Sequence, residues 1–118
     1  MKYKISELKG ALLDAAVAKA AEFPLDSDGD RLDERTNGGA PSPFHPSTDW
    51  MQGGPIIERK RIIVFPPERR GAWGAYVRPR FRFGDLHDYD GKGEGKTILI
   101  AAMRAYVASK FGEEVELP

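Results

Sequence analysis

The segment Pro43–Ile57, with the sequence PFHPSTDWMQGGPII, concentrates the features on which the fold and any site depend. It holds a histidine, small hydroxyl and acidic residues, a tryptophan and a Gly-Gly-Pro break. Ser47 or Thr48 is placed to cap a helix, and Asp49 in its first turn favours the positive end of the helix dipole. Because proline cannot donate a hydrogen bond, we expect a helix over about residues 49–59 that is kinked at Gly53–Pro55.

Two further segments, one on each side, have the composition and periodicity of helices. Residues 7–22 are mostly Leu, Ala, Lys and Glu, which are strong helix formers, and we expect Ser6 to cap them. Residues 98–111 present the widest apolar surface of the chain, with Thr97 as the N-cap and Gly112 just after the last turn. This last helix is therefore expected to be the most buried.

The predicted strands follow the central helix. Ile62–Phe65 is a β-branched and aromatic run that ends at two prolines, and Trp73–Phe83 is a longer run interrupted by Pro79. The closeness of these runs in sequence predicts an antiparallel hairpin, and the tail after Gly112 could add a short edge strand. The predicted fold class is α+β: a short antiparallel sheet of two to four strands, packed by the N- and C-terminal helices, with a kinked central helix.

Two polar segments interrupt this pattern and are predicted to be mobile loops, at residues 25–43 and 84–96. Both are rich in glycine and charged residues and lack apolar periodicity. The chain has 118 residues, which is the size of a single domain able to bury its own core. We therefore expect one small α+β domain over residues 1–118.

Composition excludes several classes of protein. The chain has no cysteine, so disulfides, thiolate catalysis and zinc fingers are ruled out, and a reducing cytoplasm suits it. Eighteen basic and eighteen acidic side chains cancel, which argues against a protein that coats DNA or a membrane surface. The start of the chain lacks the apolar core of a signal peptide, and no apolar run approaches membrane-spanning length. We expect a protein of the cytoplasm.

Two loops imitate known ligand motifs without completing them. Residues 91–97, GKGEGKT, end like a phosphate-binding loop, but Asp90 stands where that motif needs its first glycine. Residues 26–30, DSDGD, begin like a calcium loop, but Arg31 and Asn37 replace the required glycine and glutamate. A flexible turn and a solvated acidic loop are the better interpretations, and we expect no cofactor and no metal.

Three arginines alternate along the second predicted strand: Arg78, Arg80 and Arg82. On a strand their guanidinium groups would share one face, and neighbouring aromatic residues could stack on bases. This pattern gives an alternative function, a module that binds single-stranded nucleic acid. The competing interpretation is the solvated face of an edge strand, which charge protects from aggregation.

Histidine offers little catalytic chemistry. His45 and His87 are the only histidines, and no metal-binding or nucleophile motif accompanies them. A small metal-dependent or hydrolytic enzyme that uses His45 with Asp49 is a second alternative.

Three stretches together resemble the NinX-like small phage proteins. They are Ser47–Glu58 (STDWMQGGPIIE), the last helix from Leu99 (LIAAMR) through to Gly112–Glu116 (GEEVE), and the opening helix with Glu7–Gly10 (ELKG). The chain departs from the family at Ala15, where a tryptophan is common, and in longer loops at residues 26–40 and 83–95. The family has no assigned reaction, so the resemblance implies a phage or prophage setting and a small α/β domain.

These observations favour a non-enzymatic phage accessory protein that binds a host protein or a small ligand in the host cytoplasm. The candidate contact residues are Ser47, Thr48, Asp49, Trp50, Gly53 and Gly54. The competing interpretation is that Ser47 and Asp49 only cap a helix, that Trp50 fills the core and that the glycines make a bend. An edge strand would also allow a homodimer.

Overall fold

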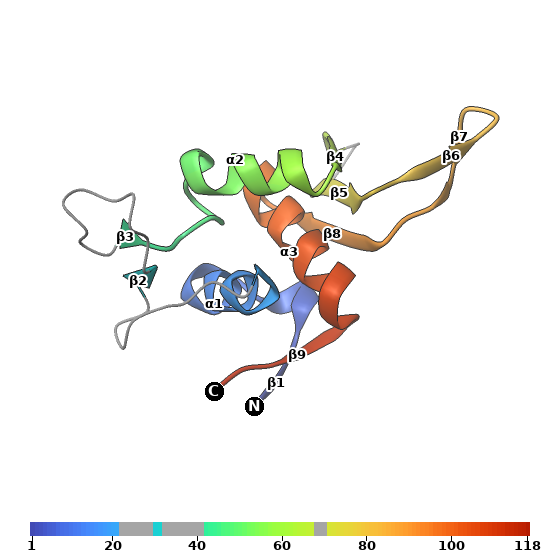
Figure 1. The fold of residues 1–118 in the computed structure, drawn as a ribbon. Coiled ribbons are helices and arrows are strands. Elements are labelled where there is room, and N and C mark those ends of the chain that lie inside the picture. Colours follow the sequence, from blue (N-terminus) through green and yellow to red (C-terminus); the bar gives the residue numbers. More distant parts are fainter. Residues whose placement is uncertain (22–29, 32–41, 68–70) are drawn as a thin grey trace.

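The computed structural model describes residues 1–21, 30–31, 42–67 and 71–118 of the chain. The described α-helices are α1 (Gly10–Ala21), α2 (Trp50–Arg59) and α3 (Ile98–Phe111), and a 3-10 turn covers Ile5–Glu7. The described strands are β1 (Lys2–Lys4), β2 (Asp30–Arg31), β3 (Ser42–Pro43), β4 (Ile62–Phe65), β5 (Trp73–Val77), β6 (Arg80–Arg82), β7 (Asp85–Asp88), β8 (Gly91–Gly95) and β9 (Glu114–Glu116). Figure 1 shows their arrangement.

Helix α3 packs on the three-stranded antiparallel sheet β4–β5–β8 (Figure 1). On β8, the residues Gly91, Gly93 and Gly95 face the helix, since they pair with the positions of β5 that are directed toward it. A Cβ atom added to Gly93 would collide with the backbone of Ala101 and Ala105. Backbone therefore packs directly on backbone, a close approach that glycine alone permits.

This packing gives the glycine-rich segment a structural role. The run that imitates a phosphate-binding loop is strand β8 followed by an N-cap, since the Thr97 hydroxyl accepts a hydrogen bond from the Ile100 N–H at 3.1 Å. The prediction of a loop over residues 84–96 is wrong, because β7 and β8 occupy most of that range.

The rest of the core surrounds α3. Helices α1 and α2 both contact it, and it buries seven of its own residues, as its broad apolar surface predicts. One partly buried cation connects α3 with the segment before α1 and with β8, because Arg104 donates from Nε to the Leu8 carbonyl at 2.9 Å and from Nη1 to the Glu94 carbonyl at 2.7 Å. Burial lowers the pKa of Arg104. Strands β1 and β9 pair antiparallel and bring the two ends of the chain together (Figure 1).

A two-stranded arm extends from the sheet. Strands β5 and β8 continue into the β6–β7 hairpin, which projects away from the body (Figure 1). Arg78, with a φ of +46°, and Pro79 separate β5 from β6, so the predicted interruption at Pro79 is confirmed. Every residue of β6 and β7 is exposed. The arm therefore contributes no side chain to the buried core.

The α+β class with a short antiparallel sheet is confirmed, and so are the β4–β5 hairpin and a strand in the tail. The start of the first helix was predicted wrongly. Ser6 lies in the 3-10 turn, Leu8 is extended, and Gly10 has a φ of +57°, so α1 begins only at Gly10. Helix α2 spans the expected residues with Pro55 inside it, and its kink stays a prediction.

Most of the segment 25–43, predicted as a mobile loop, lies outside the described residues. Within it, β2 and β3 form a short antiparallel pair, with Asp30 opposite Pro43 and Arg31 opposite Ser42. This pair precedes the turn that leads into α2.

Candidate binding surface at the start of α2

The turn before α2 is held by its own hydrogen bonds. The His45 carbonyl accepts from the N–H groups of Thr48 and Asp49 at 3.1 and 3.0 Å, and from the Thr48 hydroxyl at 3.3 Å. The Asp49 carboxylate accepts from the Met51 N–H at 2.9 Å. Asp49 is therefore the N-cap of α2, a role predicted for Ser47 or Thr48.

A buried carboxylate joins this turn to the first helix. Asp14 of α1 is 7% exposed and accepts a hydrogen bond from the Ser47 N–H at 2.9 Å. Burial raises the pKa of Asp14, and the rise is opposed by the Ser47 N–H, the Ser47 hydroxyl and nearby His45. The Ser47 hydroxyl is buried and has no well-formed hydrogen bond among the described residues, although it lies close enough to favour the charged carboxylate.

The two glycines of α2 have opposite environments. A Cβ atom on Gly53 would lie 2.5 Å from the Pro46 carbonyl oxygen and 2.6 Å from Leu99 Cδ2. A Cβ atom on Gly54 would meet only Trp50 Cε3, at 3.9 Å. Gly53 therefore seats α2 against the turn and α3, and of the pair only Gly54 lies beside an exposed side chain.

The exposed part of the predicted site is smaller than the sequence suggests. Ser47 is buried and Asp49 caps the helix, whereas Thr48 and Trp50 face solvent. Trp50 is 55% exposed and the adjacent Met51 is 87% exposed. The interpretation of Trp50 as a core residue is therefore wrong. Two large apolar side chains instead begin α2 at the surface.

His45 and Asp49 do approach each other. Their Nε2 and Oδ2 atoms lie 3.6 Å apart, and both side chains are partly exposed. The neighbouring Thr48 hydroxyl is directed to the His45 backbone carbonyl and not to this pair. Among the described residues, no group of three His, Cys, Asp or Glu side chains is placed to hold a metal ion.

Comparison with known protein families gives a match that covers most of the chain. The family model described as "Bacteriophage P22, NinX" matches residues 4–110. The chain belongs to the NinX family. The match spans α1, the α2 turn, the arm and nearly all of α3, and it confirms the resemblance noted in the sequence. No curated protein matches the chain.

The three arginines of the arm in this NinX-family chain are not equivalent. Arg80 binds Asp88 at 2.8 Å and Asp90 at 2.9 Å, and Arg78 lies 3.9 Å from Asp90. These carboxylates raise the pKa of Arg80, and Arg80 lowers the pKa of Asp88. Arg82 has no ion pair within the part of the chain that the structure describes. The predicted row of three cations is thus partly neutralised.

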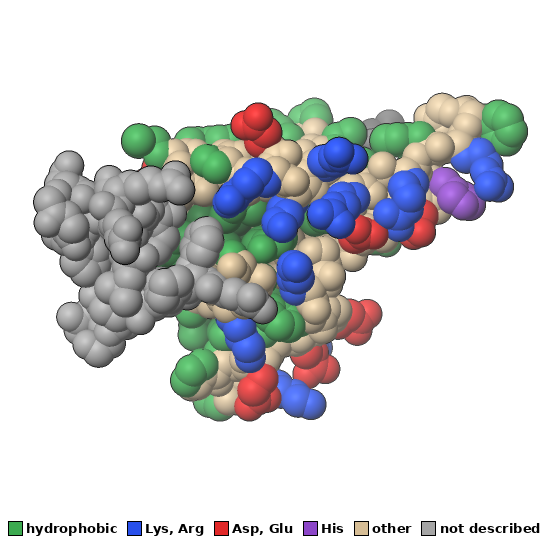
Figure 2. Space-filling model, in the orientation of Figure 1, with side chains coloured by type: hydrophobic (Ala, Val, Ile, Leu, Met, Phe, Trp, Pro, Cys, Tyr) green, Lys and Arg blue, Asp and Glu red, His purple; other side chains and the backbone are tan. Residues whose placement is uncertain are grey.

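Basic side chains do gather elsewhere in the NinX-family protein. Figure 2 shows Lys and Arg side chains over the end of α2 and the base of the arm. The sequence at this junction is Arg59-Lys60-Arg61, and the Arg61 carbonyl accepts from the Arg78 N–H at 3.0 Å. Among the described residues, every helix falls short of the length and apolar character that a membrane-spanning segment requires.

Sequence reasoning missed Asp14 and Met51. Asp14 stands between Leu13 and Val17, both fully buried, and this position in an apolar stripe is the signal that it must be buried and hydrogen-bonded. Met51 carries no such signal, because a methionine beside a tryptophan is more often part of a core.

Proposed function

We propose that this NinX-family chain is a non-enzymatic accessory protein that binds a host protein in the cytoplasm of the infected cell. Trp50 and Met51 at the start of α2 form the contact surface, with Thr48 and Gly54 beside them. The observation that supports the proposal is the exposure of Trp50 and Met51 at the start of a helix that is capped by Asp49 and preceded by a hydrogen-bonded turn.

An exposed tryptophan such as Trp50 is suited to contact with a protein partner. Tryptophan is enriched among the residues that dominate binding energy in interfaces, and methionine adapts to irregular partner surfaces. Sites for small molecules instead enclose most of the ligand surface. Side chains as open as Trp50 and Met51 suit a protein surface better than a small ligand.

The turn beneath the surface supports the same proposal. Asp49 caps the helix, and the buried contact between Asp14 and the Ser47 N–H holds the turn against α1. A pre-ordered anchor loses little entropy on binding, which increases affinity.

The proposal is tested by capture from infected cells. A tagged wild-type chain and the Trp50→Ala/Met51→Ser variant are used, with Phe81→Ala as a matched control because Phe81 is 56% exposed. The captured host protein is then purified, and its affinity is measured by calorimetry. We expect the double variant to bind at least about 30-fold more weakly, the effect of losing a dominant interface residue, and the control to bind normally.

Equal binding by wild type and the double variant would overturn this assignment, provided that both melt at the same temperature. Loss of binding by Phe81→Ala, with normal binding by the double variant, would show that the contact surface lies on the arm instead.

A second candidate function is binding of single-stranded nucleic acid. The basic junction of Arg61 and Arg78 favours it, because cations placed together attract phosphate groups. We expect Arg61→Gln/Arg78→Gln to reduce the salt dependence of binding to a labelled oligonucleotide. Arg80→Gln serves as the control, since two carboxylates already hold Arg80. Absence of retention at low salt would exclude this candidate.

A further inference from the structure

The tip of the arm carries an unusual residue. Strands β6 and β7 are joined by Phe83 and Gly84, with Arg82 paired to Asp85, so the turn has two central residues. Both have positive φ, +54° for Phe83 and +85° for Gly84, as a type I′ turn requires. Asparagine is the usual first residue of such turns, because bulky side chains are strained there. Phe83 is in addition 98% exposed.

Phe83 thus incurs two costs in the isolated chain, a strained backbone and a fully hydrated aromatic ring. The turn itself would be better served by a small polar residue. Strained residues persist at sites that bind other molecules, and an aromatic ring at the end of a projecting hairpin is placed to insert into a pocket.

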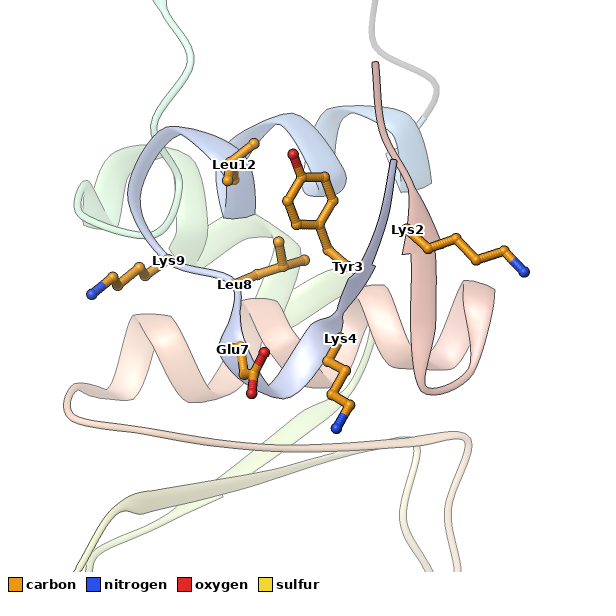
Figure 3. Close-up of a pocket in the computed structure, with 7 residues that line it drawn as sticks. All are labelled: Lys2, Tyr3, Lys4, Glu7, Leu8, Lys9 and Leu12. Atoms are coloured by element: carbon orange, nitrogen blue, oxygen red, sulfur yellow. The ribbon is translucent and has the colours of Figure 1, made fainter.

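The same chain has a pocket that fits such a ring. It lies between β1 and the start of α1, has a volume of about 290 Å³, and is lined by Tyr3, Leu8 and Leu12 (Figure 3). This volume lies at the lower edge of the range of roughly 300–1,000 Å³ found for small-molecule sites, so it is large enough to admit a phenyl ring together with part of the turn that carries it. Leu8 is buried and Leu12 is 41% exposed, so the pocket offers an apolar wall that solvent reaches.

Charge surrounds this pocket. Lys2, Lys4 and Lys9 line it together with Glu7, and their charged ends extend away from the apolar wall (Figure 3). On the arm, Arg82 and Asp85 flank Phe83, and neither has an ion pair among the described residues. The lining of the pocket carries a net positive charge and the arm tip carries none, but each charge of the tip has a candidate partner there, Asp85 among the three lysines and Arg82 at Glu7.

We propose that the arm of one chain inserts Phe83 into the N-terminal pocket of a second copy, with Asp85 directed to the lysines and Arg82 to Glu7. Reciprocal exchange of arms closes as a two-fold dimer, in which both pockets are filled. Because each contact is small, the association is expected to be weak and to depend on concentration.

This inference does not depend on the Trp50 surface, so the two can fail separately. Sedimentation velocity is measured from low micromolar to millimolar concentration on the full chain. We expect wild type to dimerise, and Phe83→Asn to remain monomeric because asparagine keeps the turn and removes the ring. Leu12→Asp places a charge in the pocket and should likewise abolish the dimer. Trp50→Ala is the control and should dimerise like wild type.

A charge exchange makes the test specific. Asp85→Lys and Lys9→Glu should each weaken the dimer at least severalfold, and the chain that carries both changes should recover it. A wild-type chain that is monomeric at all concentrations would overturn the proposal. A dimer that survives both Phe83→Asn and Leu12→Asp would overturn it as well, by locating the contact elsewhere.

Discussion

The Ser47 N–H donates to the buried carboxylate of Asp14 at 2.9 Å, across 33 positions of sequence. This contact fixes the turn that presents Trp50, because it ties that turn to α1. The segment between Asp14 and Ser47 includes most of the residues outside the described ranges, so this bond is a direct connection between the two ends of that segment. Its loss should loosen the contact surface before it affects the sheet.

Substitution of Asp14 separates the hydrogen bond from the charge. Asp14→Ala leaves the buried Ser47 N–H without its acceptor, and we expect a loss of about 1–3 kcal/mol of unfolding free energy. Asp14→Asn keeps an acceptor oxygen, so its stability at neutral pH should lie within about 1 kcal/mol of wild type. Urea denaturation measures both. Equal losses in the two variants would show that the hydrogen bond is not the stabilising element.

The same carboxylate predicts the direction of a pH effect. Its pKa is raised in the folded state by burial, so the folded protein binds this proton more tightly than the unfolded chain does. The protonation of Asp14 therefore adds to the free energy of unfolding, and this addition is fully present when the pH is below the ordinary aspartate pKa of about 3.9. It is lost as the pH rises through the higher pKa that Asp14 has in the folded protein. Because asparagine does not titrate, we expect the wild type to lose stability relative to Asp14→Asn as the pH is raised from about 3.9 through the folded pKa of Asp14. A constant difference would contradict the burial of the charged group.

The adjacent glycines of α2 provide a matched pair. Gly53→Ala should destabilise the chain by about 1–3 kcal/mol, since the new methyl group overlaps Pro46 and Leu99. Gly54→Ala has no such overlap, but its methyl group lies beside the ring of Pro55, which disfavours helical backbone at the residue before it. The gain from replacing a helical glycine and this clash oppose each other, so we expect a change within about 1 kcal/mol of wild type. Thermal unfolding should therefore place Gly53→Ala clearly below Gly54→Ala. Equal losses in the two variants would mean that α2 does not pack as described.

Strand β8 shows why part of the fold escaped prediction. The sequence GKGEG has few β-branched or apolar residues, so propensity predicts a loop. Its glycines are selected by the nearness of α3, a tertiary contact that local patterns do not contain. By contrast, local sequence signals predicted three other features. A capping threonine indicated Thr97 as the start of α3, the periodic apolar residues indicated the helix itself, and two neighbouring β-branched and aromatic runs indicated the β4–β5 hairpin.

The candidate site was predictable in position but not in its details. Small polar residues before a helix indicate a cap, and the structure assigns that role to Asp49. Pattern alone does not say whether Trp50 points inward or outward, because the helix that carries it has apolar residues on more than one face. Its exposure depends on Gly53, whose close contact with Leu99 decides which face of α2 is turned to the core.

Phe83→Asn should relieve the strain at the arm tip. Asparagine tolerates positive φ better than phenylalanine, and backbone strain of this kind costs of order 1–3 kcal/mol, so the arm hairpin should become more stable. Phe81→Asn makes the same chemical change two positions earlier, in strand β6, where asparagine is unfavourable, and it should weaken the hairpin. Hydrogen exchange of the β6 and β7 amides measures both effects locally.

Slower exchange in Phe83→Asn, together with loss of self-association, would show that the arm gives up stability for the contact that Phe83 makes. Faster exchange would show that the phenylalanine stabilises the turn, and would remove the argument that strain marks it as a contact residue.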